Sequence, residues 1–296
     1  MKIISCLVLL FCYVNTGFTQ TAPVKQNIPG SQANSSSPGD DEEDPMEKKM
    51  YFMAGLDYLS NNVYLGRKDT IAVPYYTPYA GVHFKNGIYG KVSAAYTDAG
   101  GGHIDLTTLE AGWDHSWGNI NGGINAERFF YNKNSLSVRA NTKSCVGADA
   151  QYNNDIIEPQ VVFDLNFNKS STDKVLGLEL DHNFSAVHNK VHIIPAIILN
   201  SGTQHYYDDF YINRLEKQDK TGTKKFNNVV ADANEFQALD YEISLKTTCL
   251  VGKWLISFFP TYALPVNPAN IVLSKKQHYQ ESLSNTFYLE LDFCHR

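Results

Sequence analysis

The residues that come nearest to a catalytic arrangement lie in the run Asp181-His182-Asn183-Phe184-Ser185. A serine nucleophile and a histidine base must reach hydrogen-bond distance on the same side of the chain. In a regular strand, an offset of three residues directs His182 and Ser185 to opposite faces. The run therefore predicts a hydrolase only if a bulge brings the two side chains together.

A second arrangement that could take part in chemistry is a series of polar side chains at every second position. Between Ala238 and Cys249 polar and apolar residues alternate strictly. The polar set is Asp240, Glu242, Ser244, Lys246 and Thr248, and the other set is Leu239, Tyr241, Ile243, Leu245, Thr247 and Cys249. A period of two predicts a β-strand that separates two environments.

The same alternation recurs along most of the chain. It predicts about twelve strands, within the range of closed antiparallel barrels. Their expected ranges are Met50–Leu59, Tyr75–Lys85, Ile88–Thr97, Ile104–His115, Gly118–Tyr131, Leu136–Gln151, Asp155–Phe167, Lys174–Val187, Val191–Leu199, Gln237–Leu250, Trp254–Ala263 and Asn285–Phe293.

The connections between these segments alternate in length. Asn86-Gly87 is a hairpin signal, and Ser116-Trp117 is equally short. The intervening connections are mostly longer, as at Ser60–Pro74 and Asn200–Phe236. Short turns at one end and longer loops at the other are typical of a transmembrane barrel.

Strand parity assigns side chains to the two faces of this barrel. A charge that faces lipid at mid-depth costs roughly 2–4 kcal/mol for Arg or Lys, so charges are expected inside. The predicted lumen-lining residues are Asp57, Lys91, Glu110, Asp114, Arg139, Lys143, Asp149, Asp164, Glu179, Asp181, Asp240, Glu242, Lys246, Glu290 and Asp292. Acids outnumber bases in this set, which favours cations in an open lumen.

Aromatic residues fall at both ends of the predicted strands. Those beside the short turns are Phe84, Trp113, Trp254 and Phe293, and those beside the longer loops are Tyr58, Tyr76, Tyr96, Phe130, Tyr262 and Phe287. Two such bands are typical of a barrel that meets a membrane at two interfaces.

The N-terminal residues predict export. Residues 1–19 form a signal peptide with Lys2, an apolar core and a Gly17-Phe18-Thr19 cleavage site. Residues 20–48, with the acidic run 40–44, are expected to form a disordered segment. Residues 49–296 are expected to form the barrel. The remaining cysteines, at 145, 249 and 294, have no disulfide or metal-site spacing.

On the leader, the hairpin layout and the final run Asn285–Phe293, the chain resembles the small porin-like outer-membrane β-barrels of Gram-negative bacteria. The run Ser60-Asn-Asn-Val-Tyr-Leu-Gly-Arg67 is also similar to a first-loop motif of porins, with Gly and Arg reversed. The resemblance implies an all-β, antiparallel up-and-down transmembrane barrel in the outer membrane, with a periplasmic N-terminal segment. It implies no particular substrate or catalytic residue.

These observations favour a passive channel for small cationic or neutral solutes with an acidic lumen. A salt-bridged interior would instead make a non-conducting binding, adhesion or structural barrel. The His182/Ser185 pair leaves an outer-membrane lipid hydrolase as a second alternative. A soluble exported β-sandwich is a further alternative. No cofactor or metal is expected, and the partner is membrane lipid. With a net charge of −6, the chain is not expected to bind nucleic acid.

Overall fold

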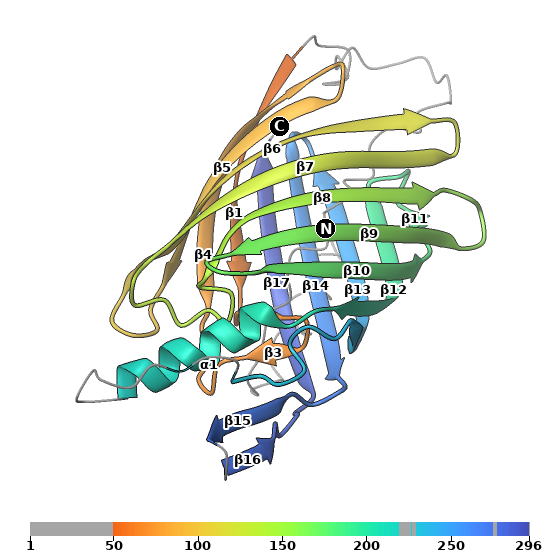
Figure 1. Ribbon diagram of the computed structural model, residues 1–296. Coiled ribbons are helices and arrows are strands. Elements are labelled where there is room, and N and C mark those ends of the chain that lie inside the picture. Colours follow the sequence, from red (N-terminus) through yellow and green to blue (C-terminus); the bar gives the residue numbers. More distant parts are fainter. Residues whose placement is uncertain (1–49, 219–225, 227–228, 275–276, 296) are drawn as a thin grey trace, which may run out of the picture.

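The computed structural model describes residues 50–218, 226, 229–274 and 277–295. The predicted signal peptide and acidic segment lie outside these residues. The chain forms one antiparallel barrel, drawn in Figure 1 with its long connections at the bottom. Within the described residues, no helix has the length and apolar character needed to span a membrane.

Twelve strands close the barrel, and each pairs with its neighbours in the sequence. They are β1 (Met50–Leu59), β4 (Tyr75–Phe84), β5 (Ile88–Thr97), β6 (His103–Trp117), β7 (Ile120–Tyr131), β8 (Thr142–Tyr152), β9 (Glu158–Asn168), β10 (Thr172–Asp181), β12 (Val191–Gly202), β13 (Gln237–Val251), β14 (Trp254–Pro265) and β17 (Thr286–His295). The first and last strands pair directly, with Asp57 opposite Asp292. The predicted twelve-stranded up-and-down barrel is therefore confirmed.

The outer wall is mainly apolar. The outward set on β13 includes Tyr241, Ile243 and Leu245, all of them exposed. The aromatic residues of the two predicted bands are exposed or half-buried at the two strand ends. Tyr58 and Tyr76, for example, are register partners whose ring centroids lie 5.1 Å apart.

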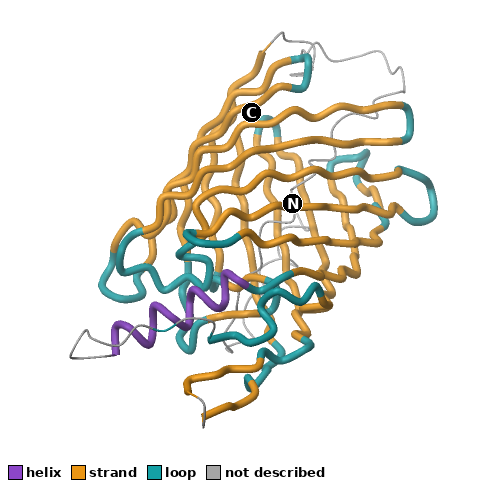
Figure 2. Tube along the Cα trace, in the orientation of Figure 1, coloured by secondary structure: helices purple, strands orange, loops and turns teal. Residues whose placement is uncertain are grey.

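Short elements that the alternation did not predict lie between the barrel strands. They are the strands β2 (Val63–Tyr64), β3 (Arg67–Lys68), β11 (Phe184–Ala186), β15 (Asn270–Ser274) and β16 (Gln277–Gln280), and the helix α1 (His205–Gln218). Except for β11, all lie at the end with the longer connections, which we call the loop end; the opposite end is the turn end. Figure 2 shows α1 in purple, running along this end.

Three predicted strand ranges need correction. Residues 136–141 form a turn before β8 rather than its first residues. The predicted strand over 174–187 breaks after Asp181 and resumes as β11, because residues 182 and 183 leave the ladder. In β13, Asn200 pairs with Asp240 and Ser201 with Ala238, so Leu239 is the extra residue of a bulge. The strict alternation over 238–249 therefore holds only from Asp240 onward.

Candidate functional site

The loop end of the barrel is covered by segments from three of its connections. We call the described residues 60–74, 203–218, 229–236, 266–274 and 277–285 the cap. They share one apolar cluster with the rim of the barrel, built from Tyr64, Leu65, Val138, Val175, Tyr206, Tyr207, Val229, Val230, Ala233, Leu239, Ala269 and Ile271. Burial of this cluster is what holds loops that are far apart in the sequence together.

The bulge at Leu239 contributes a side chain and a carbonyl group to the cap. A strict alternation would turn Leu239 toward the outer wall, beside Tyr241. The bulge instead buries Leu239 completely in the cap cluster. It also leaves the carbonyl of Leu239 free of the ladder, and this carbonyl accepts hydrogen bonds from Val266 N at 2.8 Å and from Arg67 Nη1 at 3.3 Å.

The hairpin β2–β3 crosses the mouth of the barrel. It leaves β1, and Tyr64 reaches Asn166 of β9, whose Nδ2 donates to the tyrosine Oη at 2.9 Å. In the order of the sheet, β9 lies six strands from β1 in a barrel of twelve, which is the opposite wall. Tyr64 also lies under the guanidinium of Arg139, 4.1 Å from its ring centroid, and packs edge-on against Tyr206.

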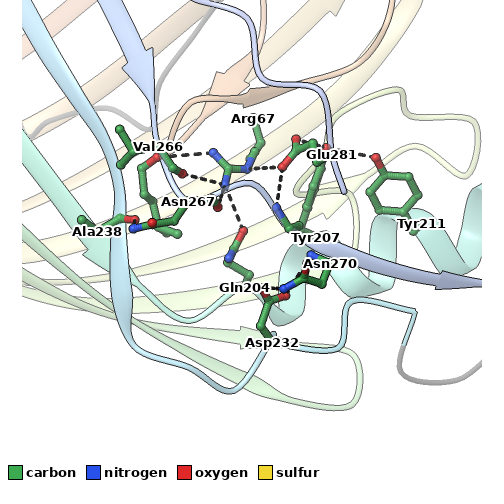
Figure 3. A network of polar contacts seen from close by, with 12 residues as sticks. Arg67, Gln204, Tyr207, Tyr211, Asp232, Ala238, Val266, Asn267, Asn270 and Glu281 are labelled. Atoms are coloured by element: carbon green, nitrogen blue, oxygen red, sulfur yellow. Dashed lines mark hydrogen bonds and ion pairs between the residues drawn. The ribbon is translucent and has the colours of Figure 1, made fainter. Parts of the chain in front are cut away.

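Arg67 is the centre of the polar contacts inside the cap (Figure 3). Its side chain is fully buried, and its Nε lies 3.2 Å from Oε2 of Glu281. Nη2 donates to the carbonyls of Asn267 and Val266 at 2.9 and 3.2 Å and to Oε1 of Gln204 at 3.4 Å. These partners come from the other two connections that form the cap, so one buried cation ties all three connections to each other.

Glu281 balances this charge and receives further donors. Tyr207 of α1 donates to its Oε1 at 2.7 Å, and the backbone N–H of Ala269 donates to its Oε2 at 3.1 Å. Figure 3 shows Tyr207 and Arg67 on either side of the carboxylate. A buried ion pair is stable only when its remaining donors and acceptors are satisfied in this way. Burial, with Glu281 as the nearest anion, raises the pKa of Tyr207, which keeps this hydroxyl a donor.

Asp173 at the start of β10 fixes the beginning of α1. Its carboxylate is fully buried and accepts from the backbone N–H groups of His205 and Tyr206 at 2.7 and 2.8 Å. Thr203 Oγ1 and Asn168 Nδ2 donate to it as well, each at 2.7 Å. A carboxylate at this place satisfies orphan N–H groups and favours the helix dipole. The barrel rim therefore caps the helix that lies over it.

Below the cap, the inner wall carries paired acids, bases and tyrosines. Lys91 Nζ lies 2.6 Å from Oε2 of Glu110, and Tyr89 donates to Oε1 of the same residue at 2.9 Å. Across β1, Tyr79 of β4 donates to Asp292 of β17 at 2.8 Å. Glu110 is thus held by side chains from the adjacent strand, and Asp292 by a side chain from the next strand but one.

Glycines on the inner wall make room for these tyrosines. Gly112 is the register partner of Tyr89, and Gly55 is that of Tyr79. A Cβ atom on Gly112 would lie 2.6 Å from the Tyr89 ring, and one on Gly55 would lie 2.4 Å from the Tyr79 ring. The tyrosine rings therefore lie flat on the wall across a glycine, a pairing that is visible in the sequence only once the register is known.

The predicted lumen residues divide into four groups. Twelve of them lie on the inner wall, buried or partly buried: Asp57, Lys91, Glu110, Asp149, Asp164, Glu179, Asp181, Asp240, Glu242, Lys246, Glu290 and Asp292. Asp114 has the inner parity but is exposed near the turn end. Arg139 belongs to the turn before β8, where it donates to Asn166 at 2.8 Å.

Lys143 is a correction to the predicted lumen set. The pairing of β8 with β9 skips from Thr142 to Ser144, so Lys143 sits at a bulge. Thr142 points inward and donates to Asn168 at 2.8 Å, whereas Lys143 is exposed on the outer side. Parity counted through a bulge assigns the wrong face from that residue onward.

Ser185, which the sequence offered with His182 as a possible hydrolase pair, lies beside His192. The register sets Ser185 opposite His192, and Ser185 Oγ lies 3.2 Å from Nδ1 of this histidine. His192 Nδ1 also lies 3.0 Å from Oδ1 of Asn183, and its Nε2 lies 3.1 Å from the carbonyl oxygen of Asn189. His182 instead packs edge-on against Phe184. These contacts of His192 lie beside a tight turn in which residues 187–189 adopt positive φ.

The residues that organise the cap were not predicted as site residues. Arg67, Asp173 and Glu281 lie in connections or at a strand start, where no period marks a buried face. The available signal was the arginine in the otherwise uncharged run Ser60–Arg67, which a buried partner would explain. Within the described residues, no group of three or more His, Cys, Asp or Glu side chains is arranged to hold a metal ion.

Comparisons with known proteins find similarity only among solved structures. No protein-family model matches the chain, and no curated protein matches it. LpxR from Salmonella typhimurium is 8% identical, with a TM-score of 0.45, over 83% of this chain and 99% of that one. The translocator domain of autotransporter NalP from Neisseria meningitidis is 11% identical, with a TM-score of 0.44, over 86% and 90%. An anion-selective porin from Comamonas acidovorans is 8% identical, with a TM-score of 0.28, over 83% and 98%.

Proposed function

We propose that this protein is an outer-membrane β-barrel whose loop end is closed by its own cap, and that it serves as a binding or structural barrel rather than as an open porin. The apolar outer wall with its two aromatic bands supports a place in a membrane. Met50 begins β1 at the turn end, opposite Phe84. In this proposal the turn end and the N-terminal segment face the periplasm.

The observation that carries the closure is the course of the β2–β3 hairpin. Tyr64 crosses to the opposite wall at Asn166, and three residues later Arg67 is fully buried among partners from the other two connections. Removing a buried charge from its partner costs about 3–5 kcal/mol. A loop held in this way is a fixed part of the fold, whereas a constriction loop of an open porin leaves a passage beside it.

Conductance in planar bilayers tests this proposal. The wild-type barrel is expected to insert without a steady ionic current. Steady current from the wild type at low voltage, with a trace indistinguishable from that of an open porin, would contradict the proposal. Heat-modifiable migration on gels, measured on the same preparation, verifies that the protein under test is the folded barrel.

A cation-selective channel that opens when the cap is displaced is the second candidate. Lys91, near the middle of β5, keeps 37% of its side chain exposed although it faces inward, so water reaches the lumen beneath the cap. Acids outnumber bases on the inner wall, as at the facing pair Asp57 and Asp292. Such a lumen would concentrate cations.

Variants of the cap separate the two candidates. Tyr64→Ala and Glu281→Gln each remove one contact that holds the hairpin, while Lys85→Gln changes an exposed residue of a turn-end connection. Current from the two cap variants, with a reversal potential that shows cation preference, supports the gated channel. Silent cap variants that still migrate as folded barrels support the non-conducting barrel.

A further inference from the structure

The outer wall of the barrel carries very few charges, and all of them have one sign. Of the Asp, Glu, Lys and Arg side chains on the described barrel strands, only Arg128 of β7, Lys143 of β8 and Lys174 of β10 face outward. All three are exposed and lie in the loop-end halves of their strands. A random scatter of tolerated charges would include acids and would spread over both ends.

Arg128 and Lys143 lie next to each other. Arg128 is the register partner of Ser144, the residue that follows Lys143. The bulge at Lys143 is what turns this lysine outward, beside Arg128 rather than into the lumen. Two basic side chains therefore meet on adjacent strands of a wall that is otherwise apolar.

Two adjoining hollows of the wall share Arg128. The first has a volume of about 340 Å³ and is lined by Leu109, Glu110, Ala111, Ala126, Glu127, Arg128 and Ser144. The second, of about 230 Å³, is lined by Arg128, Phe129, Phe130, Tyr131, Ala140, Asn141, Thr142 and Lys143. The first hollow exists because the outward register partners Ala111 and Ala126 are small. Its lining includes Ala126 and Ala111, which lie nearer the middle of their strands than Arg128 does.

The position of the pair relative to the aromatic band places it at headgroup depth. Arg128 is two residues from Phe130, a member of the loop-end band, and its guanidinium lies 5.7 Å from that ring centroid. Two residues of a tilted strand correspond to less than about 7 Å of depth. Arginine and lysine near such a band snorkel to the interface, where phosphate groups of lipids lie.

We propose that Arg128 and Lys143 bind the phosphate of an anionic lipid headgroup in the leaflet that surrounds the loop end, and that the hollow over Ala111 and Ala126 receives one acyl chain of that lipid. The inference rests on the proposed membrane location of the barrel. Arginine offers paired donors to phosphate oxygens, and lysine adds a second cation beside it. Lys174, two strands away from β8, extends the positive surface.

Native mass spectrometry of the purified barrel with phosphatidylglycerol tests the proposal. The wild type is expected to retain this lipid, and the double variant R128Q/K143Q to retain it at least roughly tenfold less, because each of the two lost charge-assisted contacts corresponds to about that factor. The matched control is K85Q/K253Q, which removes two exposed lysines at the turn end. Phosphatidylcholine and inorganic phosphate are tested as competitors.

Equal retention by the wild type and R128Q/K143Q would overturn the proposal, as would an equal loss in K85Q/K253Q. Full competition by inorganic phosphate would mean that the pair binds phosphate without the lipid, which also overturns it. Integration into vesicles is measured separately. R128Q/K143Q is expected to integrate at least as well as the wild type because it loses two lipid-facing charges. Failure of the wild type to integrate would instead contradict the membrane location itself.

Discussion

At the scale of single residues, the cap depends on charges that are buried but fully paired. Arg67 donates to the carbonyl of Val266, which lies 199 residues further along the chain. Its ion-pair partner Glu281 lies further along still. No spacing rule connects such positions, so sequence alone could not assign them. The run Ser60–Arg67 resembles a porin loop, and in the structure its arginine joins the three connections that form the cap.

A double-mutant cycle tests the Arg67–Glu281 pair. Arg67→Met and Glu281→Gln are each expected to lower the free energy of unfolding of the cap by about 3–5 kcal/mol, because each leaves a buried partner unpaired. The double variant Arg67→Met/Glu281→Gln is expected to lose less than the sum of the single changes. Protection of cap amides from hydrogen exchange measures the effect. Additive losses would show that the two charges do not act as a pair.

Asp173 offers a second test at this scale, since it caps α1 from outside the helix. Asp173→Ala is expected to cost about 1–3 kcal/mol, because the N–H groups of His205 and Tyr206 lose a buried acceptor. Asp173→Asn keeps one acceptor oxygen and is expected to cost less. Exchange at the first turn of α1 reports the loss. No change in the Ala variant, with the same exchange rates as the wild type, would refute the capping role.

At the scale of elements, the barrel strands were predictable and the cap was not. A strand between lipid and lumen must alternate along its whole length, and the resulting pattern located all twelve strands, β1 and β5 to the residue. The cap segments bury a core on no fixed period, so β2, β3, β15, β16 and α1 left no such pattern. Bulges at Leu239 and Lys143 lie near the loop ends of β13 and β8, where the regular alternation of the strands stops. Each bulge turns one side chain to the face opposite to the one that alternation predicts.

The helix α1 is expected to be more stable in acid than at neutral pH through Asp209. Partial burial, with Asp208 and Asp173 as neighbouring acids, raises the pKa of Asp209 above its usual range to about 6. A raised pKa means that the folded cap binds the proton more tightly than the unfolded chain does. The contribution is therefore complete below about pH 4 and is lost as the pH rises through about 6.

Hydrogen-exchange protection factors of α1 at pH 5 and pH 7.5 check this expectation, since they are corrected for the intrinsic effect of pH. Protection is expected to fall between the two values in the wild type and to fall less in Asp209→Asn. Glu216→Gln, which changes an exposed acid on the same helix, serves as the control. A wild-type decrease that persists unchanged in Asp209→Asn would assign the pH dependence to other groups.

At the scale of the whole molecule, one closed sheet separates the surroundings of the barrel from its lumen, and its two faces differ in residue composition. The outer wall is mainly apolar, and the three charged side chains that it carries on the described strands are basic. The inner wall holds acids together with bases, and tyrosines that lie across glycines. Strand parity predicted this separation. It could not predict the closure of the mouth, because the crossing of Tyr64 to Asn166 depends on the barrel being complete, so that opposite walls stand within reach of one hairpin.

The depth dependence of charge on the outer wall tests the membrane environment as a whole. Ile243 lies near the middle of β13 and is 54% exposed, and Val251 lies at its turn end and is 56% exposed. Arginine on the lipid face costs roughly 2–4 kcal/mol at the bilayer midplane and about 0–1 kcal/mol near the interface. Ile243→Arg is therefore expected to destabilise the barrel in vesicles far more than Val251→Arg, measured by denaturant unfolding. Because the two sites are equally exposed, a barrel surrounded by water would tolerate both changes alike, and equal stabilities would place its outer wall outside a membrane.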